Sequence, residues 1–378
     1  MKKELVLLGG GHAHMMVLEN ISTFTAKGFG VTVIGPSDFH YYSGMGPGML
    51  GGTYSPDDIR FATKDVVEKQ GGRFIRDKVE RIDPEKKSII TQTQGEVSYD
   101  VVSFNTGSYI PMAILEGSDD NIYPVKPIEK LWEASQKLET LFKRQKCRVS
   151  IVGGGPSSAE IAGNVWQLAK KSGSAMPEIT IFARHQLMCG FNQRVRSRVL
   201  ATLKKRGIRI LENARVAQVQ PGRIILESST THGTDSFDTD FTFMAPGVRP
   251  SAIFEASGLS LGPDKGLLVN EYLQSVDHPD IFGGGDCIYF QPHPLDKVGV
   301  YAVRQNPVLL HNLMAALENT ELKQFNPGPD YLLIFNLGGN NGVLKKNGIV
   351  FGGRLAFMIK DYIDTKFMKE FQAIEARL

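Results

Sequence analysis

The sequence predicts an α/β fold in which two copies of one unit, a buried strand followed by a glycine turn and a helix, each begin a parallel sheet. The first copy places the apolar residues 5–8 before the glycines of residues 9–11, and the second places residues 149–152 before the glycines of residues 153–155. A strand, a glycine turn and a helix in this order are the fingerprint of a dinucleotide-binding unit. The copies are a full domain length apart, so we expect two three-layer Rossmann-like domains.

The first glycine turn has the chemistry needed to bind a diphosphate. Gly9 permits the tight turn, and Gly11 lets the backbone approach a pyrophosphate. The helix start at His12 and Ala13 then directs N–H groups and the positive end of the helix dipole at that charge. His14 stands where a third glycine normally allows strand and helix to pack closely, and together with His12 and Ala13 it is expected to contact the bound cofactor. The alternative is a strand–helix turn that binds nothing.

The second turn repeats this arrangement. We expect Gly153, Gly155 and Ser158 to hold the pyrophosphate of a second nucleotide. That both turns bind nothing is a much weaker alternative than that one of them does. Two nucleotide sites in one chain indicate that electrons pass from one cofactor to another.

Composition limits the class of protein. The chain has 378 residues, of which 42% are hydrophobic and 22% charged, as in an ordinary soluble globular protein. A net charge of +3 with scattered basic residues argues against a nucleic-acid partner. The cysteines, at positions 147, 189 and 287, form no CxxC motif, and no metal site is predicted. No leader precedes the first strand and no apolar run would span a bilayer, so we expect a cytoplasmic protein or one on the inner face of the cell membrane.

The second strand of the first unit, residues 31–34, lacks the acidic residue that usually binds the adenosine ribose. Either Ser37 or Asp38 takes its place, or backbone groups alone hold the ribose. The aromatic and glycine-rich residues 39–54 follow. They are either a packed Ω-type loop or a wall along the ring system of the cofactor, and we favour the wall because the loop directly follows a nucleotide-binding unit.

The second strand of the second unit, residues 179–182, ends in Ala183-Arg184-His185. A carboxylate at this place would bind the free ribose hydroxyls of NADH, whereas Arg184 suits the 2′-phosphate of NADPH. A solvated basic turn is an equal alternative. The strand at residues 241–244 ends in Ala-Pro-Gly247, much as residues 101–104 end in Asn-Thr-Gly107.

A third strand with a glycine end, residues 280–287, contains Asp286. The helix start that follows would direct this carboxylate at a ribityl or phosphate oxygen, and the alternative is an N-cap without a ligand. Residues 301–313 predict a helix with a proline near its first turn.

The remaining chain predicts a hairpin around residues 338–347 and, from residue 354, an amphipathic helix. The helix would either dock on the protein's own domains or lie at a membrane interface. Its mixed charges favour docking.

Several motifs in the order of the chain resemble the landmarks of the two-dinucleotide-binding-domain flavoproteins of the pyridine nucleotide-disulphide oxidoreductase type. These are the two glycine turns, Asn105-Thr-Gly107, Ala245-Pro-Gly247 with Arg249-Pro250, and Gly284-Gly-Asp286. Within that group the chain is most similar to type II NADH:quinone oxidoreductases and to the flavoprotein domain fused to selenophosphate synthetase. The motifs typical of this subgroup are Gly-Gly-Gly-His-Ala-His, residues 43–54, Val303-Arg-Gln305 and residues 360–368.

The resemblance implies an FAD domain at 1–120 and 256–325, an NAD(P)H domain at 121–255 inserted into it, and a small α+β extension at 326–378. It implies FAD as cofactor and NADH or NADPH as co-substrate. Further cofactor-binding residues would be Thr106, Gly107, Gly285 and Asp286 for FAD and Gly247 for the nucleotide.

Two catalytic residues follow from the resemblance. In the family a glutamate near the flavin, where the nicotinamide stacks, matches Glu160, which would relay protons unless it only stabilises the helix start. A glutamine that lines the quinone site matches Gln305, next to which Asn306 replaces a small residue. Residues 40–60 contain no cysteine, which excludes disulfide exchange of the type found in related reductases.

The leading hypothesis is an NAD(P)H:quinone reductase, with a quinone or another small electron acceptor as partner and with peripheral membrane contact through the last helix. The alternative is a soluble NAD(P)H-dependent flavin reductase for a small molecule or a protein, linked to selenium metabolism. A second alternative is a non-catalytic FAD-binding redox sensor. Both a monomer and a homodimer are compatible with the sequence.

Overall fold

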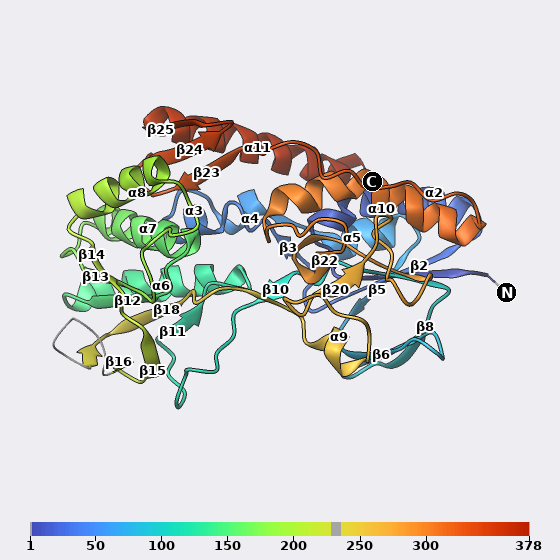
Figure 1. Ribbon diagram of the computed structural model, residues 1–378, viewed down its shortest axis with the longest axis horizontal. Coiled ribbons are helices and arrows are strands. Elements are labelled where there is room, and N and C mark those ends of the chain that lie inside the picture. The colour runs from blue at the N-terminus through green and yellow to red at the C-terminus, as the bar shows by residue number, and fades with distance from the viewer. Residues whose placement is uncertain (1, 228–235, 378) are drawn as a thin grey trace.

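The computed structural model describes residues 2–227 and 236–377 and contains two parallel sheets side by side (Figure 1). The first sheet has the order β21-β9-β1-β2-β5. Its strands are β1 (Glu4–Leu8), β2 (Gly30–Gly35), β5 (Arg73–Arg76), β9 (Val101–Phe104) and β21 (Ile281–Gly283). Residues 5–8 are at most 1% exposed, because strands of a parallel sheet are covered on both faces.

The second sheet has the order β11-β18-β12-β13-β14, in which the last four strands repeat the topology of β9-β1-β2-β5, while the edge strand β11 comes before them in the chain. Its strands are β11 (Ile122–Pro124), β12 (Arg148–Val152), β13 (Glu178–Ala183), β14 (Arg209–Glu212) and β18 (Phe241–Met244). The helices beside it are α6 (Glu129–Arg144), α7 (Pro156–Ser172) and α8 (Gln193–Lys205), and a small antiparallel sheet contains β15 (Val216–Gln220), β16 (Arg223–Leu226) and β17 (Ser236–Asp238). The repeated strand order confirms the predicted α/β fold with two Rossmann-like sheets.

The first sheet is completed only after the second has been formed along the chain, because β21 follows β18 in sequence. The two connections pair with each other as β10 (Ser108–Tyr109) and β19 (Arg249–Pro250). Figure 1 shows α10 above the first sheet and β6, β8 and α9 below it. The elements around this sheet are η1 (His12–His14), α1 (Met15–Glu19), α2 (Ile21–Ala26), α5 (Thr63–Lys69), β6 (Val79–Asp83), β7 (Ser88–Thr91), β8 (Gly95–Ser98), α9 (Ile253–Ala256), β20 (Leu267–Val269), η2 (Gly285–Cys287), β22 (Ile288–Phe290) and α10 (Gly299–Glu318).

The aromatic and glycine-rich loop is divided between two roles. Its elements and those next to it are β3 (His40–Tyr41), α3 (Gly46–Leu50), α4 (Pro56–Ile59) and β4 (Arg60–Phe61). The whole of α3 is buried and packs against α6 and α7, as the Ω-loop alternative requires. The start of the loop, at residues 40–42, lies beside the first glycine turn.

The C-terminal extension differs from its prediction. The expected hairpin is an antiparallel sheet of β23 (Leu333–Asn336), β24 (Gly342–Lys346) and β25 (Ile349–Gly353), followed by α11 (Arg354–Arg377). Half of the segment expected to be the turn is β24. The second turn is Asn347-Gly348, with φ of 47° and 79°, a pair of residues that favours a two-residue hairpin. Similarly, α10 begins at Gly299, so Pro307 lies well inside the helix and not near its first turn.

The C-terminal extension contacts the domain of the first sheet and the domain of the second sheet. On α7, Gly163 lies so close to the turn after β23 that an added Cβ would be 2.0 Å from the backbone oxygen of Leu337. At the other end, Gln372 Nε2 donates to the backbone oxygen of Asp57 at 2.7 Å, and Glu375 accepts from the backbone N–H of Ala62 at 2.7 Å. In Figure 1, α11 runs along the length of the molecule above α10. This helix is therefore docked on the protein's own domains, as its charges predict.

Candidate cofactor and acceptor site

The first glycine turn lies against the residue that follows the neighbouring strand β9. Gly9 has a φ of +87°, and an added Cβ would be 2.4 Å from the backbone oxygen of Asn105. An added Cβ on Gly11 would be 2.9 Å from both side-chain amide atoms of Asn105. Only glycine fits the first position, and glycine at the second keeps the backbone open towards a ligand.

His14 occupies the position of the third glycine and supports the turn through hydrogen bonds. It is fully buried, with Nδ1 2.7 Å from the backbone oxygen of Gly9 and Nε2 2.8 Å from Ser103 Oγ. Because a carbonyl oxygen only accepts, Nδ1 carries the proton and Nε2 accepts from Ser103. Burial lowers the pKa of His14 to about 4, so the ring is neutral. His14 thus supports the turn through these two hydrogen bonds, and its contact with a cofactor stays a prediction.

His12 lies in an aromatic cluster that reaches the last helix. Its ring centroid is 5.2 Å from that of His40, 4.9 Å from that of Tyr42 and 5.6 Å from that of Phe367 on α11. Burial and the neighbouring His40 lower the pKa of His12 to about 3, and burial lowers that of His40 to about 4. The two imidazoles beside the turn are therefore neutral. The next residue, Ala13, is fully buried.

Asp286 lies within η2, and its carboxylate faces the connection between the two sheets. Asp286 Oδ2 accepts from Lys126 Nζ at 2.9 Å and from Ser108 Oγ at 2.8 Å. Burial alone would raise the pKa of Asp286, but Lys126 and Ser108 outweigh it and hold the pKa below its ordinary value. Among the described residues the N-cap of η2 is Gly284 and receives no side-chain hydrogen bond, so the N-cap alternative for Asp286 does not hold.

The residues around the first turn fit a ligand rich in oxygen atoms. Several buried polar atoms there have no hydrogen-bond partner within residues 2–227 and 236–377: His40 Nε2, Thr63 Oγ1, Asn105 Nδ2 and Thr106 Oγ1. Thr63 lies beside Gly10, and Asn105 lies beside Gly11 and Gly285. Buried polar groups without partners are costly, and phosphate and hydroxyl oxygens would satisfy these. The predicted Thr106, Gly107 and Gly285 come together at this turn, and Gly107 has no described atom within 4 Å of an added Cβ.

The second glycine turn shows the same features. An added Cβ on Gly153 would be 2.0 Å from the backbone oxygen of Ala245, and Ser158 Oγ, 2.8 Å from that Cβ, has no partner among the described residues. Within the described chain, Gly155 and Gly247 have no atom within 4 Å of an added Cβ, so the space beside them is open. Gly155 caps α7, whose first turn begins with Pro156. This open helix start fits a nucleotide pyrophosphate.

The residues predicted to bind the two ribose groups lie at the ends of β2 and β13. Asp38 Oδ2 is 3.5 Å from Arg76 Nη1 on the neighbouring strand, and Ser37 Oγ accepts from the backbone N–H of Phe39 at 3.2 Å. Arg184 directly follows β13 and is exposed. Each is placed to meet a nucleotide held at its own glycine turn, and the choice between Ser37 and Asp38 stays open.

Glu160 meets the extension in a group made of Glu160, Tyr42, Lys360 and Asp364, which we call the acceptor-side cluster after the role proposed for it below. Glu160 Oε1 accepts from the backbone N–H of Asn336 at 2.8 Å. Asp364 Oδ2 accepts from Lys360 Nζ at 2.7 Å, and Asp364 Oδ1 accepts from Tyr42 Oη at 3.0 Å.

The electrostatics of the acceptor-side cluster keep Glu160 near the midpoint of its titration at neutral pH. Burial raises the pKa of Glu160 to about 7, against the opposing effects of the Lys360 ammonium and the Asn336 N–H. Burial would lower the pKa of Lys360, but Asp364 and Glu160 raise it overall. The motif at residues 360–368 and the aromatic loop at residues 39–54 contain Lys360, Asp364 and Tyr42, although no separate role was assigned to these side chains from the sequence. The spacing of Lys360 and Asp364, which puts them one helical turn apart, was a further signal.

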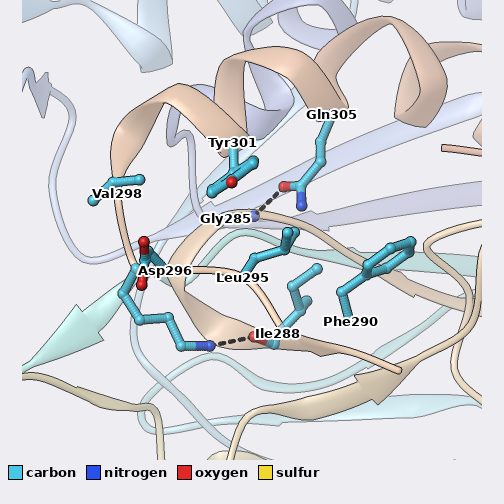
Figure 2. Close-up of a pocket in the computed structure, with 9 residues that line it drawn as sticks. Gly285, Ile288, Phe290, Leu295, Asp296, Val298, Tyr301 and Gln305 are labelled. Atoms are coloured by element: carbon cyan, nitrogen blue, oxygen red, sulfur yellow. Dashed lines mark hydrogen bonds between the residues drawn. The ribbon is translucent and has the colours of Figure 1, made fainter. Parts of the chain in front are cut away.

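Gln305 lies at the first turn and not in the acceptor-side cluster. Its Oε1 accepts from the backbone N–H of Gly285 at 2.7 Å, beside a pocket that Asp296, Lys297 and Tyr301 also line (Figure 2). The adjacent Asn306 donates from Nδ2 to the backbone oxygen of His12 at 2.5 Å and accepts from the N–H of Met16 at 3.0 Å. These two amides of α10 therefore join η2 to the first glycine turn.

Three further features limit the chemistry. Cys147, Cys189 and Cys287 are free thiols. The described part of the chain contains no group of His, Cys, Asp or Glu side chains suited to a metal ion. No helix within residues 2–227 and 236–377 is long and apolar enough to span a membrane.

The family model described as pyridine nucleotide-disulphide oxidoreductase matches residues 3–312. Among curated proteins, the type II NADH:quinone oxidoreductases of Staphylococcus aureus (strain bovine RF122 / ET3-1) and Staphylococcus saprophyticus are 22% and 23% identical, and each comparison covers 97% of this chain and 95% of the relative. These relatives are similar over their full length at low identity.

Solved structures share the fold. NDH2 from Plasmodium falciparum in complex with NADH has a TM-score of 0.82 and 15% identity, with coverage of 100% of this chain and 98% of that one. The sulfide:quinone oxidoreductase from Aquifex aeolicus has a TM-score of 0.78 and 19% identity, with coverage of 98% and 92%.

We predict that Asp286→Ala purifies largely without flavin, because the carboxylate is the charged acceptor group that the first turn offers to the cofactor hydroxyls. Flavin content per protein, measured by absorbance after denaturation, checks this. Asp277→Ala, which changes an exposed aspartate nearby in the sequence, should retain full flavin. A full complement in Asp286→Ala would mean that the cofactor is held elsewhere.

Proposed function

This chain belongs to the pyridine nucleotide-disulphide oxidoreductase family, and from that premise we propose that it passes a hydride from NAD(P)H to FAD and then electrons to a quinone. Family membership makes it an FAD- and NAD(P)H-dependent oxidoreductase. The quinone is the proposed part, and the full-length similarity to type II NADH:quinone oxidoreductases supports it. The single observation that carries the proposal is the position of Glu160 between the second glycine turn and α11.

The residues of the two turns have separate tasks in this proposal. Backbone groups of Gly9, Gly11, Ala13 and Gly285, with the side chains of Thr106 and Asp286, would hold FAD. Gly153, Gly155, Ser158 and Gly247 would hold the nucleotide. The flavin supplies hydride acceptance and electron transfer, and the protein supplies position and electrostatics. Gln305 accepts from the backbone N–H of Gly285 and so would hold η2 in place at the flavin site, while its contact with a quinone stays a prediction.

The overall reaction, NAD(P)H + H⁺ + quinone → NAD⁺ or NADP⁺ + quinol, consumes one proton. A side chain near the acceptor must therefore donate a proton at neutral pH, and it must regain one from solvent. Glu160 has a suitable pKa of about 7. The Lys360 ammonium beside it would stabilise negative charge that develops on the quinone oxygen.

An apolar stripe on α11 supports access to a membrane-dissolved acceptor. Leu355, Met358 and Tyr362, spaced to lie on one helix face, are 61%, 55% and 68% exposed. Ile349 on the preceding strand is 64% exposed. The opposite side of the same helix carries Lys360 and Asp364 of the acceptor-side cluster. We infer that this stripe contacts a lipid surface while the buried side contacts the reaction site.

An anaerobic titration tests the proposed function. NADH or NADPH should bleach the flavin absorbance, and a short-chain ubiquinone or menaquinone should restore it within the time of one turnover. Bleaching without reoxidation by quinones would favour the flavin reductase for another acceptor. A flavin that no nucleotide bleaches would favour the non-catalytic sensor.

We predict that Glu160→Gln lowers quinone-dependent kcat by about a hundredfold, since a positioned general acid contributes roughly 10²–10⁴-fold. In the wild type the rate should fall as pH rises through about 7, because the protonated carboxyl is the donor, and in Glu160→Gln this decline should disappear. Steady-state rates from pH 5.5 to 9 check both. Glu129→Gln, which changes another carboxyl whose pKa is raised by burial, is the control and should behave as wild type. An unchanged pH profile in Glu160→Gln would contradict the role.

NADPH should be accepted as donor, because Arg184 is free to pair with a 2′-phosphate and charge-assisted hydrogen bonds contribute about 1.5–3 kcal/mol each. Arg184→Glu should shift the ratio of kcat/KM towards NADH by about tenfold or more, since ~1.4 kcal/mol gives that factor. Arg144→Glu, at the end of α6, is the matched exposed control. A wild type that oxidises NADH and ignores NADPH would refute this preference.

Met358→Glu should reduce binding to phosphatidylglycerol vesicles by about tenfold or more, since burying such a side chain is worth about 1.5–3 kcal/mol. Cosedimentation of the holoprotein with vesicles measures the effect. Val276→Glu places the same charge at an apolar residue that is 37% exposed elsewhere on the surface and should leave binding unchanged. Equal sedimentation of both variants would mean that α11 does not face the lipid.

A further inference from the structure

Lys126 connects the second sheet to the carboxylate assigned to FAD. It follows β11 after Val125, whose backbone N–H donates to the backbone oxygen of Met244 at 3.1 Å and so extends the sheet by one residue. Val125 is 6% exposed and Ile128, just beyond, is 9% exposed. The backbone on both sides of Lys126 is therefore anchored, and its side chain is directed towards the first domain.

The ammonium of Lys126 forms a closed set of contacts with two residues of the first domain. Lys126 Nζ is 2.9 Å from Asp286 Oδ2 and 2.8 Å from Ser108 Oγ, and Ser108 Oγ is 2.8 Å from the same Oδ2. The side chains of Lys126 and Asp286 are 24% and 16% exposed, so solvent screens this pair less than it screens a surface ion pair. Such contacts fix the carboxylate in one orientation.

This arrangement divides the two oxygens of Asp286 between protein and ligand. Oδ2 receives two donors from the chain, whereas Oδ1 receives no hydrogen bond from any described residue. A carboxylate accepts through both oxygens, so Oδ1 is available to a hydroxyl donor. The Lys126 charge also offsets the repulsion between the carboxylate and a diphosphate bound at the nearby turn.

The same charge acts on the other side chains at the first turn. Lys126 helps to lower the pKa of both His12 and His40. Burial is the largest cause for both side chains. For His12, the effect of His40 and the opposing effect of Asp286 are also larger than that of Lys126. The cation therefore lies close to Asp286, His12 and His40, beside the turn that would hold FAD. A group that gains electrons there becomes more negative, and a nearby cation stabilises it.

We propose that Lys126 is a positioning residue for the flavin: it holds Asp286 by Oδ2 so that Oδ1 faces the cofactor, and its charge favours the reduced cofactor. This inference rests on FAD binding at the first turn and is independent of the identity of the electron acceptor. A bridge that only joins the domains would change the thermal stability of the protein but would not change the flavin midpoint potential.

Measurements on Lys126→Met, Lys126→Arg and Ser108→Ala test the proposal. The dissociation constant of FAD comes from the fluorescence of cofactor released on dilution of the holoprotein, and the midpoint potential comes from anaerobic spectroelectrochemistry. In Lys126→Met we expect FAD binding to weaken at least tenfold, and the potential to become more negative by about 30 mV, the equivalent of a tenfold change for a two-electron couple. Lys126→Arg should retain most of the wild-type FAD affinity and most of the wild-type midpoint potential. Lys130→Met, an exposed lysine on α6 paired with Glu133, is the control and should match wild type.

Ser108→Ala separates the two parts of the proposal, because it removes one donor to Oδ2 and keeps the charge. We expect weaker FAD binding with an unchanged potential. This variant and Lys126→Arg also provide a test if Lys126→Met purifies without flavin. Wild-type affinity and potential in Lys126→Met would overturn the proposal, as would a change in melting temperature alone. Neither measurement uses an electron acceptor, so the outcome of this test does not depend on whether the protein reduces quinones.

Discussion

The close approach of a glycine to a neighbouring backbone carbonyl, made once in each sheet, is the constraint on which both sites depend. Gly9 follows β1 and faces the oxygen of Asn105 just after β9, and Gly153 follows β12 and faces the oxygen of Ala245 just after β18. A side chain at either position would push the turn away from the adjacent strand. The strand ends would then separate, and the helix start would no longer point at a ligand.

Helix α10 shows how the first of these turns is stabilised although its third glycine is absent. Gln305 and Asn306, adjacent in sequence, bind η2 and the start of the first helix through their side-chain amides. His14 completes the support from the strand side through Gly9 and Ser103. The turn is held by side-chain hydrogen bonds where most members of the fold would use close backbone packing.

Local sequence patterns predicted most of the fold, since both glycine turns and their strands carry signals that need no knowledge of distant contacts. The extension was predicted less well, because β24 is half polar and its Asn347-Gly348 turn was included in a longer loop. Lys126 could not be found in this way, and for Lys360 and Asp364 the motif at residues 360–368 indicated a resemblance but no role. Each is a common charged residue that gains a role only when a strand or helix from far along the chain is packed beside it.

The late position of β21 in the chain has a consequence for biosynthesis. The first sheet lacks its β21 edge until residues 281–283 have been made, and the backbone N–H of Asn336 reaches Glu160 only after a further fifty residues or so. A ribosome-bound chain therefore completes the second sheet while β9 still has an unpaired edge, which is a period of exposure to aggregation or chaperone binding. The environment that raises the pKa of Glu160 is assembled last, so an incomplete chain that already contains both glycine turns still lacks the contacts between Glu160 and the extension.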